Sequence, residues 1–380
     1  MKALKLVNKD TSVEEVEDLY SSHGSGQPLR VPNGFKSLRL GVTSRLSQYF
    51  ITQEKRYSTD INFSWVDPEN ESNKTDIIES PICVTALLMA NDVFGDKKQP
   101  IKKLLSRSLV SRFDVPVFQK GRQIQMFAID HSIERFAWPE CFYALENGRK
   151  IPQTASYYFE ILQSYFKNVW KNSSLTVTDY IGIGELLAEL IDNTDQHAKA
   201  DFTRGVSQRS VRGVVLDTHL IAKGQSSSSI CGKNNPIATY IESLRENKST
   251  LHLLEISVFD SGPGIFRSFR SDKNDLSIQE ESKVVLSCFK NGVTSKPNGI
   301  GVGRGLDKAR LILNDRKGFL SVRTGRLAMY RNYKENPVLD VVNNQDLDIE
   351  MFDEKTNQRN VFTAMKNVEG LSYTILVPLQ

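Results

Sequence analysis

Apolar residues recur at helical spacing in the middle of the chain, between positions 178 and 200. Their spacing of i, i+3, i+4, i+7, i+8 and i+11 predicts an amphipathic helix with one buried face. These positions are Ile183, Leu186, Leu187, Leu190, Ile191 and Thr194. Similar patterns predict helices over 154–170 and 306–313, and a further helix that Pro100 opens. Two mainly apolar, strand-like runs predict strands over 123–129 and 251–260.

A polar stripe runs along the predicted helix 178–200. Glu185, Glu189, Asn193 and His197 follow one another at four-residue spacing, so they lie along one side of the helix. A solvated helix face accounts for Glu185. It accounts poorly for Asn193, since Asn is a weak helix former that prefers caps and turns. A carboxylate and an amide one turn apart suit another task, because the first can polarise a water molecule and the second can ligate Mg²⁺.

The predicted strand 251–260 ends in an acidic residue followed by a glycine-rich turn. Asp260 is succeeded by Ser261, Gly262, Pro263, Gly264 and Ile265. This composition is consistent with an ordinary tight turn. It is equally consistent with a carboxylate that accepts a hydrogen bond from an exocyclic amine such as that of adenine, with glycines that let the backbone approach a flat ring.

A second glycine cluster occupies residues 294–306, immediately before the predicted helix 306–313. Gly299, Gly301, Gly303 and Gly305 stand at alternate positions. A glycine-rich loop that enters a helix N-terminus presents free N–H groups to a phosphate, and Lys296 and Arg304 are cationic candidates beside it. The spacing matches neither a P-loop nor a dinucleotide-binding fingerprint, and a glycine-rich loop alone is a weak signal.

In this order the three blocks resemble the ATP-binding domain of the GHKL superfamily, which includes gyrases, heat-shock chaperones, histidine kinases and bacterial serine kinases. Residues 189–197 resemble its N-box, 260–264 its DxGxG box and 301–306 its second glycine box. Residues 317–325 and 370–379 are similar to its last strands. The resemblance covers about residues 155–380. It implies an α+β protein whose ATP-binding part is a two-layer α/β sandwich of the Bergerat type.

The resemblance also implies roles for individual residues. Glu189 would be the general base, Asn193 the Mg²⁺ ligand and Asp260 the residue that binds the adenine amine, with a lid from about Phe266 to Gly299. ATP and Mg²⁺ are the implied cofactors. The full set of implied ATP contacts is Asn193, His197, Asp260, Gly262, Gly264, Ile265, Thr294, Ser295, Lys296, Gly299, Gly301, Val302, Gly303, Arg304, Gly305 and Leu306.

Several features depart from the family pattern. Ser372 stands one position late for the hydroxyl that often follows the glycine of the last strand, so its contact is left open. His197 and Asp260 are 63 positions apart, which predicts an insertion near 225–248. A second insertion is predicted at 332–369, and its acidic stretch 340–354 is expected to be a solvated loop. The chain ends at the last strand, so no second domain with a catalytic lysine is expected. His131 is too close to Pro139 for a phosphoacceptor helix. Glu189 resembles the acidic residue of the serine-kinase and hydrolase branches more than the Asn common in histidine kinases, which favours chemistry on water or a hydroxyl.

Composition adds limits on location and partners. The chain has 380 residues with 49 basic and 45 acidic residues, and it has no apolar run near ~20 residues, so no membrane span is expected. The N-terminal sequence lacks a signal-peptide core and the four cysteines form no CxxC pair, which favours the cytoplasm. We expect two domains, a partner-binding part of unassigned type over 1–150 and the ATP-binding part over 151–380.

Three functions follow from these observations. The first is a regulatory ATPase or protein kinase that acts on a protein partner. The second is a nucleotide-gated interaction module without turnover, against which an intact Glu189 argues. The third is a nucleic-acid factor, supported by a basic stretch over 97–122 and ranked last because basic helix faces are usually solvated. Whether the chain forms a homodimer is left open.

Overall fold

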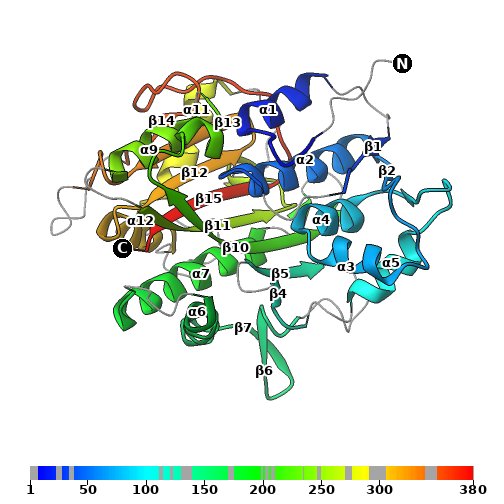
Figure 1. Ribbon diagram of the computed structural model, residues 1–380. Helices are drawn as coiled ribbons and strands as arrows, with labels where there is room; N and C mark the ends of the chain where they lie inside the picture. The colour runs from blue at the N-terminus through cyan, green and yellow to red at the C-terminus, as the bar shows by residue number, and fades with distance from the viewer. Residues whose placement is uncertain are drawn as a thin grey trace.

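A computed structural model describes most of the chain. The described residues are 7–22, 28–33, 38–110, 114–119, 123–129, 139–169, 175–197, 200–201, 205–206, 210–233, 235–245, 250–269, 276–290, 305–338 and 349–379. The protein is a mixed α/β protein built around one large antiparallel sheet (Figure 1).

Within the described residues, the sheet has eight strands in the order β14-β13-β12-β15-β11-β10-β5-β4. Each neighbouring pair is antiparallel. In the order of the sheet, the strands are Phe352–Asp353, Leu327–Asn332, Phe319–Thr324, Leu371–Pro378, Thr250–Asp260, Val211–Ala222, Gln123–Ile129 and Val117–Gln119. The long strands β10 and β11 form the centre.

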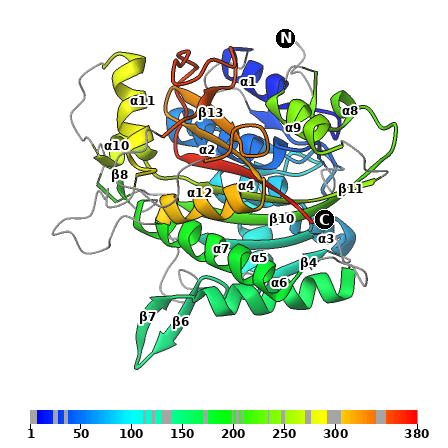
Figure 2. The ribbon, with the colours of Figure 1, turned by 90° about the vertical axis from the view of Figure 1, so that its left-hand side faces the viewer.

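Helices α6 (Ala155–Val169), α7 (Val177–His197) and α12 (Gly305–Asp315) cover one face of this sheet (Figures 1 and 2). Alternate residues of the central strands, such as Leu254 and Ile256 of β11, pack there against α7. Helices α10 (Ile265–Phe269) and α11 (Ile278–Ser287) lie at the edge of the same layer.

The opposite face is covered as well. Helices α1 (Val13–Ser22), α2 (Val42–Tyr57) and α4 (Pro81–Met89) pack on it, against side chains such as Phe127 of β5 and Phe259 of β11. Helices α8 (Ser227–Cys231) and α9 (Pro236–Arg245) cover the remaining part of this face. The sheet therefore lies between two helical layers, whereas the expected two-layer sandwich has helices on one face. The reason is that helices from the N-terminal third bury the face that the sequence pattern left open.

Short elements complete the described chain. Strands β1 (Leu29–Arg30), β2 (Ile61–Asn62) and β3 (Val93–Phe94) form a small parallel sheet near α3 (Glu71–Ile78) and α5 (Lys102–Val110). Strands β6 (Tyr143–Glu146) and β7 (Arg149–Pro152) form a hairpin that projects on the side of α6 (Figures 1 and 2). Strands β8 (Ala200–Asp201) and β9 (Gly205–Val206) form another hairpin.

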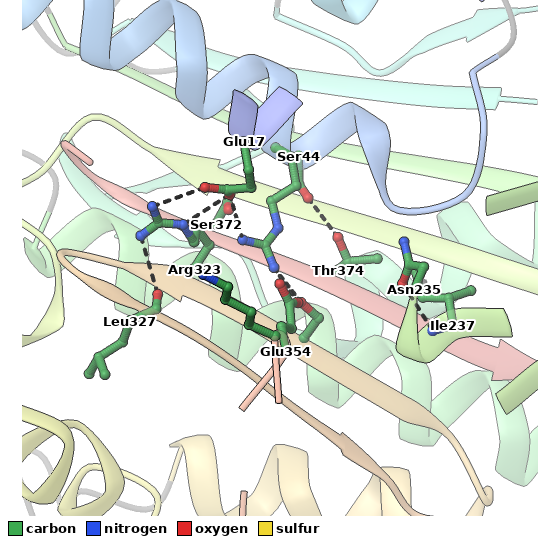
Figure 3. A network of polar contacts seen from close by, with 12 residues as sticks. Glu17, Ser44, Asn235, Ile237, Arg323, Leu327, Glu354, Ser372 and Thr374 are labelled. Atoms are coloured by element: carbon green, nitrogen blue, oxygen red, sulfur yellow. Dashed lines mark hydrogen bonds and ion pairs between the residues drawn. The ribbon is translucent and has the colours of Figure 1, made fainter. Parts of the chain in front are cut away.

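Buried polar contacts fasten the N-terminal layer to the sheet (Figure 3). Glu17 of α1 pairs with Arg323 of β12 at 3.0 Å between Oε1 and Nε, and with Arg45 of α2 at 3.4 Å. Arg45 also pairs with Glu354, next to β14. Ser44 of α2 and Thr374 of β15 form a hydrogen bond of 2.6 Å between their hydroxyls. Strands from both sides of residue 150 and helices from the first hundred residues thus share one packed unit.

The predicted helices and strands are confirmed within a few residues. The predicted segments 178–200, 154–170, 251–260 and 123–129 correspond to α7, α6, β11 and β5. Both segments that the sequence marks as insertions form packed structure where the structure describes them. The segment near 225–248 forms α8 and α9, whose Tyr240 is buried against β12. In the second segment, residues 339–348 of the expected acidic loop lie outside the described residues, while Met351 and Phe362 are buried against the core.

Candidate functional site

Helix α7 carries the polar stripe of the sequence. Its apolar side chains, among them Leu186, Leu187 and Leu190, are buried in the core, so the helix is fixed against the sheet. Glu189 and Asn193 are half-buried on its flank. The Nδ2 atom of Asn193 is buried and has no hydrogen-bond partner among the residues that the structure describes. An amide left unsatisfied by the protein in this way is suited to a bound ligand.

Helix α12 runs antiparallel to α7 along this flank. Arg316 pairs with Asp179, a Cβ added at Gly182 would lie 3.7 Å from Ile312, and Lys308 pairs with Glu185 at 3.4 Å. These contacts are three residues apart along α7 and four residues apart, in the reverse direction, along α12. By this progression the first residue of α12, Gly305, comes level with the turn of α7 that carries Glu189. The positive end of α12 therefore faces the polar stripe.

Asp260 lies at the end of β11, with its side chain 1% exposed. Its Oδ1 atom accepts a hydrogen bond of 2.8 Å from the backbone N–H of Gly262. Burial raises the pKa of the Tyr373 hydroxyl well above its usual value, and the Asp260 carboxylate nearby raises it further. The predicted strand end thus carries a buried carboxylate, as the sequence pattern indicated.

The glycine turn after Asp260 is fixed by the neighbouring strands. Gly264 has a φ of +80°, and a Cβ added there would lie 2.8 Å from Thr324 Oγ1. The same hydroxyl accepts a hydrogen bond of 3.0 Å from the N–H of Ile265. A Cβ added at Gly370, where φ is +75°, would lie 2.0 Å from the carbonyl oxygen of Asp260. Only glycine fits the close approach of β15 to this strand end.

The strand register decides which side chains share the site. Asp260 is opposite Arg212 of β10 on one side and Leu371 of β15 on the other, and Leu371 is opposite Thr324 of β12. Ser372 is one residue further and points to the other face, where its hydroxyl bonds to Gln48 Oε1 at 2.9 Å. The contact that the sequence left open for Ser372 is therefore directed away from Asp260.

A cluster of polar residues beside Asp260 was missed by sequence reasoning. Arg212 is fully buried and pairs with Asp195 of α7 at 3.3 Å between Nη2 and Oδ1. The hydroxyl of Tyr143 accepts a hydrogen bond from Arg212 and donates one to Asp195. An arginine within the apolar run 211–216 was the available signal, but a sequence cannot show which carboxylate such a residue meets.

Several predicted residues lie outside the described part of the chain. They are Thr294, Ser295, Lys296, Gly299, Gly301, Val302, Gly303 and Arg304, together with His131 and the side chain of His197. Leu306 is half-buried against the core. The predicted lid is described only in α10 and α11, and Glu281 of α11 is bound to Arg326 at 2.8 Å between Oε2 and Nε.

Neither a metal cluster nor a membrane helix is found in the part that the structure describes. No group of three or more His, Cys, Asp or Glu side chains there could hold a metal ion. None of the described helices combines the length and the apolar character needed to cross a bilayer.

Comparison with known proteins adds no family. No protein-family model matches the chain, and no curated protein matches it. The functional assignment therefore depends on the residues and their geometry.

Proposed function

We propose that the protein binds Mg·ATP at the end of β11 and acts as a regulatory ATPase or protein kinase of the GHKL type. One observation carries the proposal. Asp260, the turn of α7 with Glu189 and Asn193, and the N-terminus of α12 come from distant parts of the sequence and meet at one end of the sheet. They belong to the three blocks that the resemblance requires at a single site, although of the second glycine box only Gly305 and Leu306 are described.

Asp260 supplies the contact to the nucleobase. Its carboxylate is buried, and the turn that follows has no side chains at Gly262 and Gly264. A hydrogen bond from the adenine amine to a carboxylate in such a place is strong, because water competes poorly for it.

The N-terminus of α12 supplies the contact to the phosphates. Its first backbone N–H groups have no partners within the helix, and the helix dipole favours an anion there. Gly305 begins this helix, so the backbone can approach a phosphate without steric hindrance from a side chain. In this proposal the phosphates bind beside Glu189, which lies on the turn of α7 level with the start of α12.

Asn193 fits the role of a group that binds the metal–phosphate end of the nucleotide. Its unsatisfied amide can hydrogen-bond a phosphate oxygen or, through its oxygen, ligate Mg²⁺. Bound Mg²⁺ would neutralise charge on the phosphates. Glu189, one turn earlier, would take the proton from a water molecule or from a hydroxyl of a protein partner.

The binding step is tested with the variant Asp260→Asn. Loss of the charged acceptor should weaken Mg·ATP binding by about ten- to a hundred-fold, which corresponds to ~1.5–3 kcal/mol. Isothermal titration calorimetry measures the affinity. Asp217→Asn is the matched control, because Asp217 is a buried carboxylate on β10 that bonds to Gln123. Unchanged affinity in Asp260→Asn would remove Asp260 from the site.

The chemical step is tested with Glu189→Ala. ATP affinity should remain similar, while phosphate release or phosphoryl transfer falls by ~10²–10⁴-fold. Glu185→Ala is the control, because Glu185 lies one turn earlier and pairs with Lys308. Tight ATP binding by the wild type without any turnover, with or without a partner, would favour the nucleotide-gated interaction module instead.

The partner is proposed to be a protein that the N-terminal region binds. The N-terminal helices are packed on the sheet whose strands carry the site, so a partner bound to them would act on the same packed unit. Affinity purification with and without ATP tests this proposal. Recovery of nucleic acid in place of a protein would support the third function.

A further inference from the structure

The two ends of the proposed ATP site lie on different elements of the fold. Asn193 is on α7, whereas Asp260 is on β11. ATP can contact Asn193 and Asp260 together only if α7 keeps a fixed position along its axis and a fixed rotation about it relative to β11. We infer that Arg212 and Asp195 form a clamp that fixes this relation, so that both are positioning residues for nucleotide binding. The inference rests on the proposed function.

The first half of the clamp is the strand register. Arg212 is directly opposite Asp260 in the antiparallel pair of β10 and β11. Residues directly opposite each other point to the same face, with Cβ atoms ~4.5–5.5 Å apart. Both side chains are buried, with exposed fractions of 0% and 1%. The position of Arg212 is therefore fixed relative to Asp260, the residue proposed to contact the base.

The second half is the ion pair to the helix. Asp195 forms an ion pair with Arg212, at 3.3 Å between Oδ1 and Nη2, and accepts a hydrogen bond from the hydroxyl of Tyr143 on β6. Asp195 is two residues beyond Asn193, and two residues correspond to about 200° around a helix. Arg212 thus contacts α7 on the side that carries Asp195. Glu189 and Asn193 lie on the other side of the helix, beside α12.

This geometry gives the clamp a specific effect. If the bond to Asp195 is released, α7 can rotate or slide relative to β10, and Asn193 moves relative to both Asp260 and the start of α12. An apolar pair of the same volume would hold the elements with comparable stability. The feature that distinguishes the ion pair is its directional geometry, with Tyr143 as a third fixed point.

The experiment compares two ligands, Mg·ATP and adenosine, on the variant Asp195→Asn. This variant leaves Arg212 and Asp260 in place, so adenosine, which needs only the base contact, should bind within about three-fold of wild type. ATP, which spans both ends, should bind about ten-fold more weakly or worse. A general loss of structure would weaken both ligands equally. Arg45→Met is the control, because Arg45 is a buried, ion-paired arginine on the opposite face of the sheet.

The double variant Arg212→Met/Asp195→Asn tests the pairing. Its loss of ATP affinity should equal that of Arg212→Met, because either change breaks the same bond. If Asp195→Asn does not fold, Tyr143→Phe removes only the hydroxyl of the cluster and should shift the ratio of the two affinities in the same direction.

The outcomes separate this inference from the proposed function. If the wild type binds neither ligand, the proposed function fails and the inference fails with it. If the wild type binds both, but the variants weaken ATP and adenosine equally, weaken neither, or show additive losses, only the clamp is overturned.

Discussion

The ion pair between Glu17 and Arg323 should be a major contributor to the attachment of the N-terminal layer. Arg323 is 0% exposed, and both oxygens of Glu17 accept from it, at 3.0 Å from Nε and 3.2 Å from Nη2 (Figure 3). The charge of Glu17 also balances Arg45 at 3.4 Å. Glu17→Gln removes this charge and keeps the size of the side chain.

The expected loss follows from what remains around Arg323. Its guanidinium keeps hydrogen bonds to the carbonyl oxygens of Gly325 and Lys366, at 2.7 and 2.5 Å. The Glu354 carboxylate also attracts it, but Glu354 is ion-paired with Arg45. Removal of one partner from a buried ion pair typically costs about 3–5 kcal/mol. The glutamine can still accept one hydrogen bond, so a loss near the lower end, about 3 kcal/mol, is expected.

Urea unfolding followed by circular dichroism measures this loss. The midpoint should fall while the slope stays constant, because the folded structure is otherwise unchanged. Glu71→Gln is the control, since the Glu71 side chain is 81% exposed in its pair with Lys74 and should contribute little. A loss in Glu17→Gln no larger than that of the control would refute the reasoning that burial makes this pair important.

Three further predictions concern single sites. Gly370→Ala should destabilise the protein by more than the ~1–2 kcal/mol of a left-handed residue, because its Cβ would lie 2.0 Å from the Asp260 carbonyl oxygen. Gly224→Ala, at φ +81° with open space, is the control in the same urea assay, and equal losses would contradict the steric argument. Burial raises the pKa of Glu354, so the folded form binds its proton before the unfolded form does. As the pH falls from neutral toward 4.5, the wild type should gain stability relative to Glu354→Gln, and a constant difference in unfolding free energy would contradict this. Burial also raises the pKa of three thiols to about 12, namely those of Cys83, Cys231 and Cys288. A colorimetric thiol reagent at neutral pH should therefore react with them only after unfolding, and rapid reaction of the folded protein would contradict their burial.

The sequence by itself determined the local elements and indicated several residues of the candidate site. The helical period of residues 183–194 predicted α7, and the apolar run that ends in Asp260 predicted β11. Asp260 and Gly264 were indicated because turn chemistry and glycine conformations depend on a few adjacent residues. Such signals are local, so a linear pattern contains them.

The tertiary structure alone decided how these elements meet. The pairing of β5 with β10 and the packing of α2 on the sheet join the N-terminal region to the predicted ATP-binding part, and no periodicity contains that information. The register turned Ser372 away from Asp260, because a shift of one residue reverses the face of a strand. Arg212 stands in the sequence as a single cation within an apolar run, which does not show what it pairs with. Its role depends on Asp195 and Asp260, which strand pairing and helix packing bring to it across long chain separations.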